Sequence, residues 1–187
     1  RLVGNGTMYI SAPVTLGADN RLTGGAVITA DSVRIKHVAA ADSFKLMAPV
    51  TTMVMEAGAT FNKKIIGDGG TLDLEFVSLN EYAPAISNFT TVNIHQMAQT
   101  NLNASTWRTG FSGSLPENCQ VNFDNHVEGN VVPNGFGVTS TALQHVKLNL
   151  GPHTRLVRQY NEASNGNDVL YVGELTGDAT SRLETGF

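Results

Sequence analysis

Ionisable side chains recur at a nearly constant spacing in the first half of the chain. Lys36, Glu56, Glu75 and His95 each follow directly after an apolar residue of an alternating segment. If these segments are strands stacked in equal register, the four side chains form one outward ladder, with Glu56 and Glu75 about 5 Å apart at Cβ. Two carboxylates at that separation can divide into an acid and a nucleophile, as in a retaining glycosidase. The alternative is a solvated row of screened charges.

A second candidate set lies in the segment FDNHVEG. Asp124, His126 and Glu128 share one face of a predicted strand, with about 6.5–7 Å between successive side chains. A carboxylate–imidazole–carboxylate set can do acid/base work or hold a divalent cation. Three residues on one straight strand are too widely spread to close on a zinc ion alone. The alternative is again a solvated strand face.

Trp107 and Arg108 lie in a stretch without alternation, flanked by Gly110, Gly113 and Pro116. An exposed Trp beside polar groups can hold the apolar face of a sugar ring, whereas a buried Trp would plug an end of the fold. Trp107 and Arg108 are therefore candidate ligand-binding residues, together with Lys36 and His95.

Composition excludes several classes of function. The net charge is −4 and no cluster exceeds two Lys or Arg in a row, so the chain lacks the basic footprint of a nucleic-acid-binding protein. No apolar run approaches the roughly 18 residues of a membrane-spanning helix, so no membrane insertion is expected. The single Cys119 excludes an internal disulfide and a cysteine-based zinc site. The chain also lacks P-loop, G-x-S-x-G and H-E-x-x-H motifs, and we expect neither a cofactor nor a metal.

Strand-type alternation is the dominant pattern, and it recurs with a period. Self-similarity at about 20 residues predicts an all-β fold, a right-handed parallel β-solenoid, in which each rung buries its apolar face against the next. An antiparallel β-sandwich has similar strand spacing and is the competing fold. The segment Val38–Ala48 is predicted to contain one helical turn. The apolar residues that mark the period are Leu16, Ile35, Met55, Leu74 and Ile94.

The period degrades after residue 100. Residues 101–118 are irregular, and alternating strands return at 121–123, 146–150 and 169–175 with larger spacing. Either the rungs continue with longer loops, or a β-rich end domain begins near residue 100. The predicted division is therefore 1–100 and 101–187.

A cassette of similar residues lies near both ends of the chain, at Tyr9–Gly25 and Tyr171–Gly186. Each copy begins with Tyr, continues through an extended run and a Gly/Asp turn, and closes with Arg-Leu and Gly. If both are rungs, both Tyr rings face outward while Leu22 and Leu183 face inward. We expect Arg182–Phe187 to be covered by another subunit or domain, since exposed strand edges are usually covered.

The segment Gly4–Ala26 resembles the early rungs of pectate-lyase-like right-handed β-helices, particularly phage tailspikes and bacterial surface proteins. The resemblance implies a homotrimer on a virion tail or at the extracellular surface, with a cell-surface polysaccharide as ligand. It implies an adhesive, glycan-recognising module, or alternatively a polysaccharide-degrading glycoside hydrolase or lyase. The acids of this chain are scattered, which favours the non-catalytic module. The resemblance rests on Gly6, Tyr9, Ile10, Pro13, Val14, Leu16, Asn20, Leu22 and Gly24.

Overall fold

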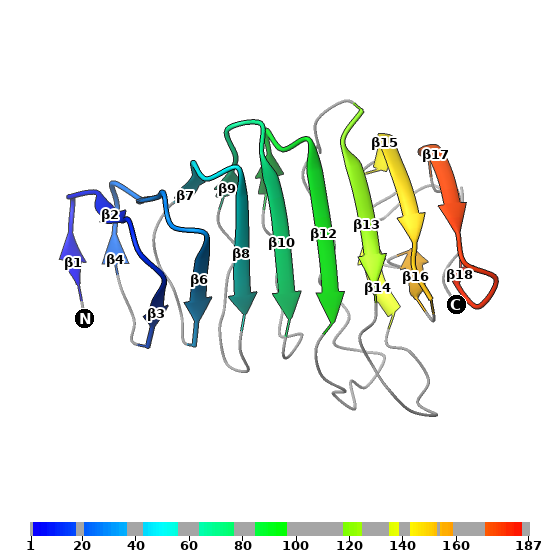
Figure 1. Ribbon diagram of the computed structural model, residues 1–187, viewed down its shortest axis with the longest axis horizontal. Coiled ribbons are helices and arrows are strands. Elements are labelled where there is room, and N and C mark those ends of the chain that lie inside the picture. The colour runs from blue at the N-terminus through cyan, green and yellow to red at the C-terminus, as the bar shows by residue number, and fades with distance from the viewer. Residues whose placement is uncertain are drawn as a thin grey trace, which may run out of the picture.

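The computed structural model describes residues 2–17, 21–36, 43–55, 64–76, 85–96, 118–124, 135–138, 143–152, 154–158 and 171–184. Within these ranges the secondary structure is strands and turns without a helix, and every strand pairing is parallel. The strands succeed one another along the molecule, with the two termini at opposite ends (Figure 1). The predicted all-β solenoid is therefore confirmed, and the parallel pairing rules out the antiparallel sandwich.

The largest sheet has eight strands and runs the length of the molecule (Figure 1). Its spatial order is β17-β15-β13-β12-β10-β8-β6-β3. Each strand thus stacks on the corresponding strand of the rung before it. The strands are β3 (Val14–Leu16), β6 (Ser32–Ile35), β8 (Val50–Met55), β10 (Thr71–Phe76), β12 (Thr91–Gln96), β13 (Gln120–Asp124), β15 (Leu143–Leu150) and β17 (Val172–Gly177).

A second sheet has five shorter strands, and each of them precedes a strand of the eight-stranded sheet in the chain. Its order is β11-β9-β7-β5-β2. The strand β7 covers residues 43–46 of the segment that was predicted to contain a helical turn, so the prediction is wrong for these residues, while residues 38–42 lie outside the described ranges. Phe44 and Leu46 alternate inward there and are buried, which is a strand pattern. The strands are β2 (Met8–Ile10), β5 (Ala26–Ile28), β7 (Ser43–Leu46), β9 (Lys64–Ile66) and β11 (Ala85–Ser87).

Short strands form a third side at both ends of the molecule. The strand β4 follows β3, and β14, β16 and β18 follow β13, β15 and β17, so all four occupy the same place in a rung. Both Arg-Leu pairs of the cassette belong to this side, in β4 and β18. A further Arg-Leu copy, at 155–156, pairs in register with that of β18. The strands are β1 (Val3–Gly4), β4 (Arg21–Leu22), β14 (Gly135–Val138), β16 (Arg155–Arg158) and β18 (Arg182–Glu184).

The cassette residues have the predicted orientation in three of four cases. Tyr9 is 78% exposed and Tyr171 is 53% exposed, while Leu22 is buried. Leu183 is 39% exposed and departs from the prediction. It lies on β18, the edge strand of its sheet, with no further strand stacked on it in the described part of the chain. The predicted covering of Arg182–Phe187 is not tested, and residues 185–187 lie outside the described ranges.

The predicted register is correct for the first three rungs and then wrong by two residues. Leu16 pairs with Ile35 and Ile35 with Met55, as predicted. Leu74, however, pairs with Met53 and not with Met55. Because side chains alternate with a period of two, a shift of two residues keeps the same face inward. Apolar alternation therefore could not detect it.

The core consists of apolar rows that continue from rung to rung. One row follows the register of the eight-stranded sheet, and its members are at most 3% exposed. The five-stranded sheet contributes a facing row, so the interior is filled from both sides. Each buried Leu, Ile or Phe stabilises the stack by about 1.5–3 kcal/mol relative to exposure. The first row is Val33, Met53, Leu74, Ile94, Phe123 and Leu150, and the facing row includes Phe44, Ile65 and Ile86.

Tight corners connect the two main sheets. A Cβ on Gly70 would lie 2.6 Å from the carbonyl oxygen of Pro49 in the rung before, so that position requires glycine. Asn88 adopts a left-handed φ of 62°, and its Nδ2 donates to the carbonyl oxygen of Gly67 at 2.8 Å. An Asn tolerates this conformation better than most residues do. Both contacts connect a corner to the rung before it.

The eight-stranded sheet continues directly from the first half of the chain into the second. Strand β13 pairs with β12, and Phe123 is the register partner of Ile94. The segment of chain from Ile94 to Phe123 is longer than the segment from Leu74 to Ile94, which are also register partners. Rungs are thus longer after β12, as the larger spacing of the alternating segments indicated. The division into two domains near residue 100 stays a prediction.

Candidate functional site

A row of polar side chains crosses the outer face of the eight-stranded sheet. Five residues occupy consecutive register positions on β10, β12, β13, β15 and β17. Each of the first four lies between two inward-facing apolar neighbours, as Asn93 does between the buried Val92 and Ile94. Adjacent members are therefore about 4.8 Å apart along the sheet. We call this set the amide row: Asp73, Asn93, Asn122, Asn149 and Thr176.

Hydrogen bonds between rungs orient the amide row. Nδ2 of Asn93 donates to Oδ1 of Asp73 at 2.6 Å, and Nδ2 of Asn122 donates to Oδ1 of Asn93 at 2.7 Å. At the other end, the hydroxyl of Thr176 donates to Oδ1 of Asn149 at 3.1 Å. Aligned dipoles of this kind polarise one another, which strengthens each bond modestly. These bonds orient Asn93 and Asn122 at one end of the row and Asn149 at the other.

Each amide of the row keeps further hydrogen-bonding capacity. A carboxamide has two N–H donors and two acceptor lone pairs, and Asn93 uses one donor and one lone pair within the row. Asn93 and Asn122 are half-buried, so neither residue is fully covered by the protein. The Asn members of the row can therefore offer both donors and acceptors to a ligand lying along the solenoid.

A second outward row holds the ionisable groups. Glu75 is the register partner of His95, and His95 is that of Asp124. On the other side, Glu75 pairs with Val54, and Val54 with Arg34. A carboxylate and an imidazole on neighbouring strands, about 5 Å apart at Cβ, can share or transfer a proton. We call Glu75, His95 and Asp124 the acid–imidazole row.

The structure gives the predicted site residues partly different register partners from those expected. Glu75 and His95 are register partners, as predicted. The expected neighbour of Glu75 on the other side was Glu56, but the register of β8 and β10 places Val54 there. The predicted pairing of the two glutamates is therefore wrong, because the ladder shifts by two residues between these strands. Glu56 itself lies outside the described residues.

Other predicted site residues fall on separate parts of the chain. Lys36 is exposed directly after β6, three strands from His95 in the sheet order. Asp124 is the last residue of β13, and it belongs to the acid–imidazole row because it is the register partner of His95. Catalytic and ligand-binding roles for all these residues stay predictions. Trp107, Arg108, His126 and Glu128 lie outside the described residues.

Cys119 lies in the core directly before β13 and is 1% exposed. Burial disfavours the thiolate and raises the pKa of the thiol to about 11. A thiol in this state is a poor nucleophile. Across the described ranges, His, Cys, Asp and Glu side chains do not gather into a set that could hold a metal ion.

Most of the amide row was missed as a functional feature, although the sequence contains a signal for it. The members lie between apolar residues in the triplets LDL, VNI, VNF and LNL, so an Asp or Asn occupies the outward position of four strands. Spacing alone did not align these triplets, since the intervals between them are unequal, with Asn122 much further from Asn93 than Asn93 is from Asp73. Only the register of the folded chain shows that they form one row.

Comparison with family models, curated proteins and solved structures found no match for this chain. In the described part of the chain, no helix has the length and apolar character to cross a membrane.

Proposed function

We propose that this chain is a structural and glycan-recognising module of a phage tailspike or bacterial surface protein, located on a virion tail or at the extracellular surface. The observation that carries the proposal is the amide row, a set of hydrogen-bond donors and acceptors aligned in register on the outer face of the eight-stranded sheet. Sugar hydroxyls are both donors and acceptors, and they match carboxamides and carboxylates along such a line. The resemblance of Gly4–Ala26 to tailspike rungs adds support.

The test is a glycan-array screen of the intact chain, followed by titration of each hit with variants of the row. We expect Asn93→Ala and Asn122→Ala to weaken binding about tenfold each, since each removes a hydrogen-bonding group of about 1 kcal/mol or more. Asn5→Ala, an exposed position on the first rung, serves as the matched control and should leave affinity unchanged. Thermal melts verify that the variants are folded.

Two results would contradict the proposal. One is a screen of polysaccharides from diverse cell surfaces that yields no binding at all. The other is binding that Asn93→Ala and Asn122→Ala leave unaffected while both proteins remain folded. Asn149→Ala gives a further variant of the row if either of these two fails to fold.

A second candidate function is polysaccharide cleavage, favoured by the acid–imidazole row. Glu75 and His95 are adjacent on the same face as the amide row, so a glycan bound there would lie beside them. Product analysis on every hit of the screen tests this, with Glu75→Gln as the variant. Shortened oligosaccharides that disappear with Glu75→Gln would support cleavage by this row, and intact glycan throughout would refute it.

We also propose that the chain self-associates, as a homotrimer. Apolar side chains are exposed on both the first and the last described rungs, including Val3 at 64% and Leu175 at 49%. Exposed apolar surface of this kind favours association. Light scattering at micromolar concentration tests the state, and a stable monomer would refute it.

A further inference from the structure

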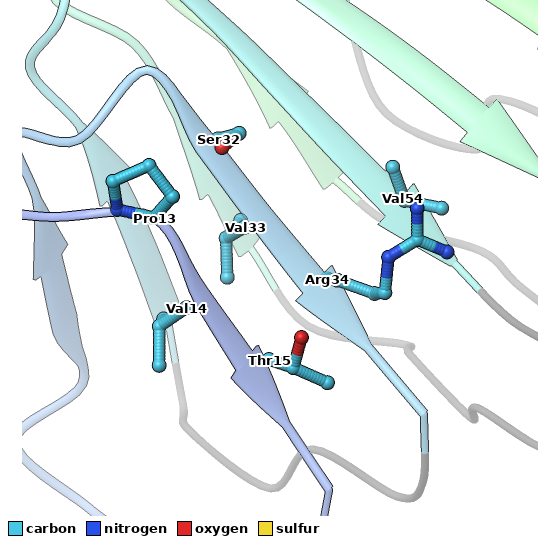
Figure 2. A pocket seen from close by; sticks show the side chains of 7 residues that line it. All are labelled: Pro13, Val14, Thr15, Ser32, Val33, Arg34 and Val54. Carbon is cyan, nitrogen blue, oxygen red and sulfur yellow. The ribbon is translucent and has the colours of Figure 1, made fainter.

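A groove lies on the outer face where β3, β6 and β8 adjoin (Figure 2). Its volume is ≈ 240 Å³. Its lining residues with polar side chains are Thr15, Ser32 and Arg34, and the remaining lining residues are apolar. The complete lining is Pro13, Val14, Thr15, Ser32, Val33, Arg34 and Val54.

Packing constrains the position of Arg34 in the groove. Its register partners are Thr15 on β3 and Val54 on β8. Val54 occupies an outward row, yet it is only 7% exposed, and the side chain of Arg34 lies against it in Figure 2. The aliphatic stem of an Arg can cover an apolar neighbour while its head remains in water. Arg34 is exposed, and the planar fork of five N–H donors in its guanidinium matches carboxylate, sulfate and phosphate groups.

Charge is distributed unevenly over this face. Lys36 follows Arg34 by two residues, so both cations lie at the β6 end, about 6.5–7 Å apart. Asp73 and Glu75 lie on β10, two strands away, or about 10 Å. The charges of the described residues therefore favour an anionic group over β6 and disfavour one over β10. The whole chain carries a net charge of −4, so any preference for an anion must arise locally.

We propose that the Arg34 groove is a subsite for the anionic substituent of an acidic polysaccharide, a carboxylate or a sulfate or phosphate ester. The substituent is held by the guanidinium fork, and the hydroxyl-bearing residues Thr15 and Ser32 also line the groove. The neighbouring uncharged sugar units extend over β8 and β10 to the amide row. This inference rests on the proposed glycan-binding function and specifies its ligand class and the direction in which the glycan lies.

The test compares three oligosaccharides of equal length: one neutral, one carrying a uronic acid, and one carrying a sulfate ester. Isothermal titration is made with the wild-type chain and with Arg34→Gln, which removes the charge while keeping a polar group on an aliphatic stem. Arg34→Lys keeps the charge but removes the fork. Lys147→Gln is the matched control, because Lys147 lies exposed on the same sheet at β15, five strands from β6. It removes one positive charge at a distance of about 24 Å.

We expect at least one acidic oligosaccharide to bind about tenfold tighter than the neutral one. Arg34→Gln should abolish that preference without changing the affinity for the neutral glycan, Arg34→Lys should restore it only in part, and Lys147→Gln should preserve it. The uronic acid and sulfate arms show which anion the groove takes.

Equal binding of neutral and acidic glycans would overturn the groove assignment and leave the proposed glycan-binding function intact. A preference that Lys147→Gln reduces as much as Arg34→Gln would also overturn it, since the effect would then be one of overall charge. Absence of binding to all three, and to every glycan of the broader screen, would refute the glycan-binding function together with this inference.

Discussion

Thr51 is the buried polar residue whose replacement tests the packing of the solenoid most directly. It lies on β8 in the inward row next to Leu72 and is 0% exposed. Its hydroxyl oxygen is buried and has no hydrogen-bond partner among the residues that the structure describes. An unsatisfied buried hydroxyl costs about 1–3 kcal/mol. We therefore predict that Thr51→Val, which exchanges this hydroxyl for a methyl group of similar size, stabilises the chain.

The expected gain is about 1–2 kcal/mol, the lower part of that range, because local relaxation recovers some of the cost. For a chain of this length, each kcal/mol raises Tm by about 2–4 °C. Urea denaturation measures the free energy of unfolding, and an unchanged m-value shows that the same surface is exposed on unfolding. Thr51→Ser distinguishes the effect of the hydroxyl from that of the methyl group of Thr51, since it keeps the hydroxyl and removes the methyl. It should destabilise by about 1 kcal/mol.

Thr52→Val is the matched control, because Thr52 is half-buried on the outer face of the same strand. It should change stability by less than about 0.5 kcal/mol. The reasoning is refuted if Thr51→Val unfolds at the same or a lower urea concentration than the wild-type chain. It is also refuted if Thr52→Val stabilises equally, since the gain would then reflect strand propensity and not the buried hydroxyl.

Two further predictions concern the core thiol and the corners. Because the pKa of Cys119 in the folded chain is about 11, above its ordinary value of 9.0, its contribution to stability is complete below pH 9 and is lost as the pH rises toward 11. Urea melts of wild-type and Cys119→Ala chains across this window should show the stability difference shrinking by at most about 1.4 kcal/mol per pH unit, and a constant difference would contradict the assignment. Gly70→Ala should destabilise by more than about 1 kcal/mol, because its Cβ meets the backbone of the neighbouring rung. Gly17→Ala meets no atom within 4 Å and should be near neutral in the same assay, so equal effects of the two would refute the steric argument.

Local patterns in the sequence were sufficient for the class of fold. Alternation such as Leu72-Asp73-Leu74 can bury one face only in a strand, and its recurrence at a regular period requires strands that stack on one another. The exposed positions of Tyr9 and Tyr171 followed from the same alternation. These properties depend on neighbouring residues alone, which is why they could be predicted without the structure.

The segment around Phe44 shows where local patterns become ambiguous. A short run with two apolar positions fits a short strand or a single helical turn equally well. Its pairing with β5 and β9 decides for the strand, since hydrogen bonds to both neighbouring rungs satisfy its backbone. Residues distant in the sequence therefore determine that the segment around Phe44 is a strand.

The sequence by itself determined which side chains face outward, but only the tertiary structure decided which of them are neighbours. Register depends on the length and geometry of each corner, and a change of two residues leaves the inward and outward faces unaltered. For this reason the register partners of Glu75 are Val54 and His95, although Glu56 was expected at the position that Val54 occupies. The register between rungs also brings Asn93 and Asn122 together in the amide row. These two residues lie far apart in the chain and only one strand spacing apart in the fold.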